Sequence, residues 1–462
     1  MNYTDNNKKR KWIIILWSLV LALVAISLSF NKSIWLDEAL SLRWISMPWA
    51  EMMDHLIADV HPPLFYIVLK LFSFASPGSI ALGKACAILS YVLTMLLGGL
   101  FLQKYFSTSS AFFFTLFTTS IPMTLVKTVE IRMYTMTMLF MVVTSIFVYR
   151  IVLNSCSNIN WIGFIIFGLA TAYTHYYGLL SMAFFYPALL LYLVIEKDWK
   201  AVKKWFIYSA ITIVVYLPWL PIAIRQVTAV NNDYWIDSQR PVSYMKDLFR
   251  YDFFPHSTKV YCGVIALSGL FLLVQFVRKK EAVYYWGLAC MIPFIAVFTF
   301  AYVYGVIMRP IMVVRYLLPA LTLLIFGISV MCKDISNWIT SVVCIFFIVM
   351  ICFNYPLAYE NEYDTNTDKT MTFWEENIEE DAKVYLTEGA LHAVILYSFP
   401  NTVLGSFEEL LKMKSLPDEF WILDVHDEVS SNKVKFAGYE MDCYKNMGLD
   451  NVDFTIYHFW AK

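Results

Sequence analysis

Long apolar runs separated by short polar connections dominate the first three quarters of the chain. A run of about 20 apolar residues in helical form crosses a hydrocarbon core about 30 Å thick, and a helix satisfies its own backbone hydrogen bonds there. We therefore predict about eleven membrane-spanning helices. We place them at about 12–30, 80–102, 111–128, 133–151, 161–177, 179–196, 205–223, 260–277, 283–303, 315–331 and 337–355.

The hydrophobic pattern changes after residue 355, where the chain becomes polar and charged. The segments "AKVYLTE", "FWILDVH" and "FTIYHFW" have the length and residue types of short strands, and "SFEELLKMK" has those of a helix. This indicates a small α/β domain at 356–462 that follows a transmembrane domain at 1–355. The fold class expected is thus mainly α: a polytopic helical bundle with a small soluble C-terminal domain.

Two other segments depart from the spanning pattern. "HPPLFYIVLKLFSFA", at 61–75, is too short to cross a membrane, and Pro62 and Pro63 suit the start of a helix. We expect a short helix there, in or near the outer membrane interface. The long polar loop at 224–259 is typical of a lid or a binding loop.

Composition and charge placement support this picture and orient it. The 462 residues are 59% hydrophobic and only 15% charged, which indicates an integral membrane protein in contact with lipid. The net charge of -1, without a large basic block, argues against a nucleic-acid partner. If the N-terminus is cytoplasmic, the cytoplasmic connections hold most of the basic residues, as the positive-inside rule requires. The C-terminal domain would then be extracytoplasmic.

Several polar side chains interrupt the apolar pattern on the predicted outer side. Ionisable groups at membrane depth are costly unless they face a cavity or one another, so a shared outward-facing cavity would explain them. Each also has an ordinary structural explanation: an acidic helix end, a polar turn, a local ion pair, an interfacial histidine or an arginine that extends to the headgroups. The residues are Asp37, Glu38, Asp59, His61, Glu130, Arg132, Tyr134, His175, Arg309, Arg315 and Tyr316.

The order of these motifs resembles a known family. An acidic DE pair in the first external loop, "HPP", "EIRMY", "THYYG" and "RYLLPAL" are similar to motifs of the bacterial relatives of protein O-mannosyltransferases. Those proteins are polytopic type C glycosyltransferases, grouped with the aminoarabinose transferase of lipid A. The resemblance covers residues 1 to about 330 and implies a multi-pass protein of the bacterial inner or plasma membrane.

The resemblance also implies a reaction, in which a sugar moves from a polyprenyl-phosphate donor to an extracytoplasmic glycan, lipid or protein. Asp37 matches the acidic residue taken as catalytic in the family, with Glu38 beside it to orient the acceptor or help hold an ion. Glu38, Asp59 and His61 match positions that line the donor or acceptor cavity of the family. Arg132 and Arg315 would be candidates for the donor phosphate, and Glu130, Tyr134, His175 and Tyr316 would complete the site. Metal use differs within the family, so a divalent metal stays possible and no ligand is assigned.

The residue types suit this chemistry. A lipid phosphate that leaves a sugar needs charge stabilisation, which an arginine supplies, and the acceptor hydroxyl needs one carboxylate as a base. Direct displacement with a single base inverts the anomeric carbon. The alternative is a lipid or glycan transporter or flippase, although no internal repeat with matching broken helices is visible.

Overall fold

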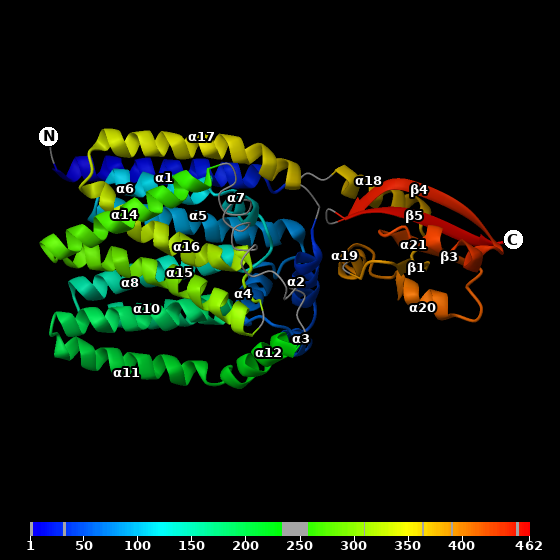
Figure 1. Ribbon diagram of the computed structural model, residues 1–462, viewed down its shortest axis with the longest axis horizontal. Coiled ribbons are helices and arrows are strands. Elements are labelled where there is room, and N and C mark those ends of the chain that lie inside the picture. The colour runs from blue at the N-terminus through cyan, green and yellow to red at the C-terminus, as the bar shows by residue number, and fades with distance from the viewer. Residues whose placement is uncertain are drawn as a thin grey trace.

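The protein, described here from a computed structural model, is a helical bundle with a smaller sheet-containing part beyond one end (Figure 1). The structure describes residues 3–30, 34–232, 257–308, 310–362, 365–389, 391–449 and 452–462. The N-terminus of the first helix lies at the end of the bundle away from the sheet (Figure 1). The bundle helices are α1 (Tyr3–Ser27), α5 (Ile80–Tyr105), α6 (Thr108–Ser120), α7 (Pro122–Lys127), α8 (Tyr134–Leu153), α9 (Asn158–Thr174), α10 (Tyr176–Ile195), α11 (Trp199–Tyr216), α12 (Leu220–Asn232), α14 (Thr258–Lys279), α15 (Ala282–Ile307), α16 (Val314–Ile328) with the 3-10 turn η2 (Ser329–Lys333), and α17 (Asn337–Glu362).

The predicted spans are present as helices, but not all are long enough to cross a membrane alone. Within the described residues, 8 helices have the length and apolar character of a span, or 9 if the bent pair α11 and α12 forms one. The remaining two predicted spans correspond to α9, with 17 residues, and to the segment that breaks into α6 and α7. The estimate of about eleven spans therefore exceeds the number of helices that meet the length requirement.

Helix α16 is the central element of the bundle, because 89% of its apolar membrane-spanning stretch is buried. Its neighbour α15 approaches it closely because glycines face each other: a Cβ on Gly327 would lie 2.5 Å from the carbonyl oxygen of Gly287. Small residues at such contacts allow helix backbones to pack tightly in a membrane. The tight contact fixes the last turn of α16 against α15, and Arg315 lies in the first turn of α16, at the other end of the helix.

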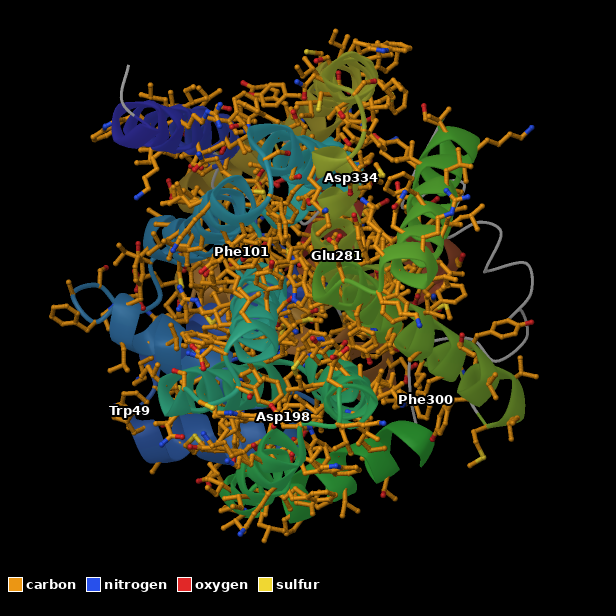
Figure 2. The ribbon with its side chains drawn as sticks, turned by 90° about the vertical axis from the view of Figure 1, so that its left-hand side faces the viewer. Trp49, Phe101, Asp198, Glu281, Phe300 and Asp334 are labelled. Atoms are coloured by element: carbon orange, nitrogen blue, oxygen red, sulfur yellow. The ribbon has the colours of Figure 1, made fainter. Side chains whose placement is uncertain are left out.

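The opposite end of the bundle carries charged connections. Figure 2 views this end, where Asp198, Glu281 and Asp334 lie in the turns between helices. Asp334 is within 3.3 Å of Lys333 and 3.4 Å of Lys279. These lysines belong to the basic connections from which we predicted a cytoplasmic N-terminus.

Three short helices cover the sheet end of the bundle: α2 (Leu36–Ser46), α3 (Trp49–Ala58) and α4 (Leu64–Phe72). Helix α2 begins with a capping arrangement in which the Glu38 carboxylate accepts a hydrogen bond from the backbone N–H of Trp35 at 3.1 Å. Helix α4 begins directly after Pro63, as the proline pair predicts. The apolar pattern did not predict α2 and α3, because each is short and only partly buried.

The C-terminal part is built on a five-stranded mixed sheet with the order β2-β1-β3-β5-β4. Strand β1 pairs in parallel with β2 and β3, whereas β5 runs antiparallel to both β3 and β4. The three predicted strands and the predicted helix are confirmed as β1, β3, β5 and α20. The elements are α18 (Thr365–Asn377), β1 (Lys383–Leu386), α19 (Leu391–Ser398), β2 (Val403–Ser406), α20 (Phe407–Lys412), β3 (Glu419–Asp424), α21 (Glu428–Ser431), η3 (Lys433–Phe436), β4 (Tyr439–Leu449) and β5 (Val452–Ala461).

This C-terminal part packs directly on the short helices. One hydrophobic cluster contains side chains of α2, α4, α19, β1 and β3. The Tyr397 hydroxyl donates a 2.6 Å hydrogen bond to the carbonyl of Gly78, a residue with φ of 84° that favours glycine. The last bundle helix, α17, continues to Glu362, beyond the predicted boundary at 355. The sheet thus covers the end of the bundle at which the predicted site residues lie.

Candidate active site

Asp37 lies in the first turn of α2, at the sheet end of the bundle, with 26% of its side chain exposed. Its carboxylate is 3.6 Å from a guanidinium nitrogen of Arg132. Its backbone carbonyl accepts hydrogen bonds from the Ser41 hydroxyl and from Arg132. These hydrogen bonds hold the backbone of Asp37, while its side chain stays partly accessible to a reacting group.

Glu38, the neighbouring carboxylate, is buried, and both of its oxygens accept hydrogen bonds. One oxygen accepts from the N–H of Trp35 and the other from the N–H of Ile131 at 2.7 Å. These two bonds hold the start of α2 against the segment that precedes α8. The geometry fits a positioning residue, whereas from the resemblance we expected Glu38 to orient the acceptor or hold an ion.

Arg132 is the most enclosed charge of the site, with 2% of its side chain exposed. One terminal nitrogen donates to the carbonyl of Asp37, to the Ser41 hydroxyl at 3.1 Å and to the Tyr66 hydroxyl at 3.2 Å. The other terminal nitrogen lies 3.1 Å from Nε2 of His61. Because these partners come from α2, α4 and the loop before α4, the guanidinium joins three segments.

Asp59 and His61 extend this chain of contacts. Nδ1 of His61 lies 2.7 Å from the Asp59 carboxylate, and Nε2 faces Arg132, so the neutral tautomer with hydrogen on Nδ1 satisfies both contacts. Burial alone would raise the pKa of Asp59. The hydrogen bond and charge of His61 and the charge of Arg132 outweigh it and lower the pKa below its ordinary value. Asp59 therefore remains a carboxylate and keeps His61 oriented.

An aromatic wall with a second arginine lies beside this network. Nε of Arg315 donates to the Tyr134 hydroxyl at 3.0 Å, and its guanidinium stands 5.1 Å from the centre of the Trp35 ring and 5.5 Å from that of Tyr316. His175 is buried against the same rings, 5.0 Å from Tyr316, and its Nδ1 accepts from the N–H of Tyr177. The wall is rigid because aromatic side chains from four segments support one another.

The sequence reasoning missed Lys127, whose ammonium forms an ion pair with the Glu130 carboxylate. It also missed Trp35, Ser41 and Tyr66, which contact the predicted site residues directly. A lysine three residues before Glu130 is a visible local signal for the ion pair. The contacts of Ser41 and Tyr66 have no such signal, because they depend on tertiary packing.

All ten predicted site residues lie at this end of the bundle. Arg309 and most of the 224–259 loop fall outside the described residues. Within the described residues, no group of three or more His, Cys, Asp and Glu side chains is placed to hold a metal ion. The arrangement offers two partly exposed carboxylates, Asp37 and Asp59, of which Asp59 is paired with His61. The network of Arg132 and the aromatic wall with Arg315 lie beside them.

A substitution of Asp59 tests the orientation of His61. Asparagine can donate to Nδ1, which allows the other tautomer and places an N–H against Arg132. We expect Asp59→Asn to slow the reaction implied by the resemblance about ten-fold, the effect of losing about 1.5 kcal/mol from one hydrogen bond to a charged group. Asp54→Asn on the exposed face of α3 is the matched control, and an unchanged transfer rate for Asp59→Asn would contradict this orientation.

Comparison with known proteins establishes the fold. No family model and no curated protein sequence matches the chain. Among solved structures, ArnT from Cupriavidus metallidurans in the apo state is similar over 97% of this chain and 97% of that chain, with a TM-score of 0.68 and 11% identity. The structure of ArnT bound to undecaprenyl phosphate is similar over 96% of this chain and 97% of that chain, with a TM-score of 0.67 and 11% identity.

A second similar protein is the archaeal oligosaccharyltransferase AglB from Archaeoglobus fulgidus, whose structure is in complex with an inhibitory peptide and a dolichol-phosphate. It is similar over 94% of this chain and 73% of that chain, with a TM-score of 0.52 and 10% identity. ArnT and AglB are both type C glycosyltransferases. The chain therefore has the type C glycosyltransferase fold, which confirms the fold class expected from the sequence.

Proposed function

We propose that this protein is a membrane glycosyltransferase that moves a sugar from a polyprenyl-phosphate donor to an acceptor hydroxyl outside the cytoplasm, with inversion at the anomeric carbon. One observation carries the proposal: Asp37 is a partly exposed carboxylate, held by the buried Arg132, next to the Arg315 and Trp35 wall. Support also comes from the fold neighbours, since ArnT was solved with undecaprenyl phosphate and AglB with a dolichol-phosphate.

The proposed reaction is a single displacement. The Asp37 carboxylate takes the proton of the acceptor hydroxyl while the oxygen of that hydroxyl forms a bond to the anomeric carbon. The bond from that carbon to the phosphate oxygen breaks, and the phosphate leaves with both electrons. Arg315 stabilises the negative charge that develops on the phosphate. The acceptor gains the sugar, and polyprenyl phosphate is released.

An apolar groove on the flank of the bundle suits the lipid part of such a donor. It lies between α10 and α15, has a volume of about 520 Å³, and is lined by Phe184, Thr299, Phe300 and Val303 among others. Figure 2 labels Phe300 on this flank. The groove reaches Met308 at the end of α15, close in the chain to Arg315. An isoprenoid chain in this groove would bring its phosphate toward the wall.

The proposal is tested by mass spectrometry of envelope glycans and glycolipids from cells with and without the protein. We expect one sugar residue to disappear from one class of acceptor and its polyprenyl-phosphate form to accumulate. If the protein were a lipid transporter, cells without it would instead retain the sugar on its carrier in the cytoplasmic leaflet. A membrane-impermeant reagent, which reaches only the outer leaflet, detects this difference. Glycans and carrier lipids that are the same with and without the protein would contradict the proposed transferase activity.

Replacement of Arg315 separates donor binding from acceptor binding. Arg315→Ala removes charge-assisted hydrogen bonds to the phosphate worth about 1.5–3 kcal/mol, so we expect the donor KM to rise about 10- to 100-fold with little change for the acceptor. Arg225→Ala is the matched control, because Arg225 at the same end bonds the carbonyl of Ile57. Equal losses for donor and acceptor would contradict contact with the phosphate.

A further inference from the structure

A buried glutamine of α12, Gln226, joins two segments of the candidate site. Helix α12 follows α11 after a bend of 66° and packs beside the short helix α3 (Figure 1). Gln226 faces the protein interior and is 2% exposed, whereas its neighbour Arg225 is exposed. The reaction scheme above gives Gln226 no role, although its partners lie next to residues of the site.

Each polar group of the Gln226 side chain has a partner. The amide nitrogen donates to the carbonyl of Leu56 at 2.8 Å and to that of Ile57 at 3.3 Å. The amide oxygen accepts from the Tyr176 hydroxyl, which in turn accepts from Nε1 of Trp219 at 3.2 Å. Glutamine suits this place because one planar amide carries both donors and an acceptor.

The two carbonyls belong to the last turn of α3. That helix ends at Ala58, and Asp59 has an extended backbone, so the last carbonyls have no partner within the helix. Helix α3 has 10 residues, of which Met52 and Leu56 are buried, and so short a helix is marginal without tertiary contacts. The donors on α12 therefore help to fix where α3 ends.

The end of α3 in turn sets the place of the Asp59 and His61 pair. Asp59 directly follows α3, and its carboxylate lies 2.7 Å from Nδ1 of His61. The other partner of Gln226, Tyr176, directly follows His175, whose ring centre lies 6.4 Å from that of His61. Gln226 thus links the two segments whose histidines meet in the site.

We infer that Gln226 is a positioning residue for the proposed reaction: it holds the last turn of α3 against the first turn of α10 and thereby keeps His61 in contact with Arg132. This inference rests on the proposed function and deepens it. The effect of Gln226 on Asp37 passes through Asp59, His61 and Arg132, which form one chain of contacts.

Arg225 bonds the same turn of α3 but is dispensable for this role. It donates to the carbonyl of Ile57 at 2.8 Å from the exposed side of α12. Because Gln226 also donates to Ile57, replacement of Arg225 leaves that carbonyl with a donor and leaves the Leu56 bond intact. Replacement of Gln226 instead removes the donor to Leu56 and the acceptor of the Tyr176 hydroxyl, and unpaired polar groups are costly in the interior.

The inference is tested by hydrogen–deuterium exchange of the purified full-length protein in nanodiscs. We expect Gln226→Leu to accelerate amide exchange in peptides that cover residues 56–61 at least about five-fold, because a lost hydrogen bond raises the population of the opened helix end by about that factor. Gln103→Leu is the matched control. Gln103 is also buried, but it lies near the end of α5, at the opposite end of the bundle, and its replacement should leave this exchange unchanged.

Transfer kinetics show whether the change reaches the site. We expect Gln226→Leu to slow sugar transfer about five- to ten-fold, as one or two lost hydrogen bonds would. If Gln226 acts through the Asp59 and His61 pair, adding it to Asp59→Asn should slow transfer little further, whereas a general loss of structure would multiply the two losses. Multiplying losses, or a normal rate in Gln226→Leu, would overturn the inference.

Tyr176→Phe tests the same link should Gln226→Leu fail to fold. It removes only the hydroxyl that donates to Gln226, so we expect faster exchange at 56–61 and a transfer rate about two- to five-fold lower, again without multiplying the loss in Asp59→Asn. Unchanged exchange at 56–61 overturns the inference alone. Absence of sugar transfer by the wild-type protein would overturn it together with the proposed function.

Discussion

Replacing Asp37 by asparagine is expected to lower the rate of sugar transfer by about 10²- to 10⁴-fold, the usual contribution of general-base catalysis. The amide has the shape of the carboxylate but cannot accept the proton of the acceptor hydroxyl. The contact with Arg132 involves only one oxygen, at 3.6 Å, and an amide oxygen can preserve it. The measurement is the initial rate of transfer in proteoliposomes, with the sugar identified by the glycan comparison.

Binding measurements make the Asp37 result specific. We expect Asp37→Asn to bind undecaprenyl phosphate as the wild-type protein does, because Arg315 is retained. Asp54→Asn, on the neighbouring short helix, controls for the loss of one acidic charge at this end. Transfer at a near-normal rate by folded Asp37→Asn would remove Asp37 from the catalytic role.

The two adjacent carboxylates show how far the sequence can lead. Adjacent residues of a regular backbone project in different directions, so the sequence predicts that only one of Asp37 and Glu38 faces a reacting atom. It does not predict which one. That depends on the backbone N–H of Ile131, far along the chain, which donates a 2.7 Å hydrogen bond to the Glu38 carboxylate. Tertiary contacts of this kind leave no periodic signal.

The fold was predictable where apolar runs are continuous and less so where helices break. Proline at the first position of α7 separates it from α6, and the prolines of "YLPWLP" lie where α11 and α12 meet at 66°. The hydropathy pattern averages over such breaks and therefore predicts a single span at 111–128 and another at 205–223. The short helices α2 and α3 were missed because they are too short to span a membrane; α2 is buried against α4 and α19, and α3 packs on α2 and α12.

The sequence predicts the candidate site as a set of polar residues that interrupt the apolar pattern, but it does not predict which of them contact one another. Asp59, His61 and Arg132 each stood out as costly polar groups near membrane depth, and the structure joins them in one chain of contacts. Lys127 did not stand out, because an ion pair with Glu130 explains it locally. Its proximity to Trp35 requires that α7 pack beside the start of α2, which only the three-dimensional structure shows.

The second large effect is expected at Arg132. Arg132→Gln removes the donors shared by Asp37, Ser41, Tyr66 and His61, and breaking a buried charged network of this kind costs about 3–5 kcal/mol. We expect a lower midpoint of thermal unfolding and a transfer rate at least about 10²-fold below wild type, measured on the folded fraction. Arg225→Gln serves as the control. Arg132→Lys should recover little, because an ammonium cannot reach these separate partners at once.

A double substitution decides whether Arg132 acts through Asp37. If the arginine only positions the carboxylate, Arg132→Gln should slow transfer little further in a protein that already carries Asp37→Asn, because the group it orients has lost its function. If Arg132 binds the donor phosphate instead, the two losses should multiply, and undecaprenyl phosphate binding should fall in Arg132→Gln as we expect it to fall in Arg315→Ala. Unchanged lipid binding together with non-multiplying losses would show that Arg132 positions the Asp37 base and would leave the phosphate to Arg315.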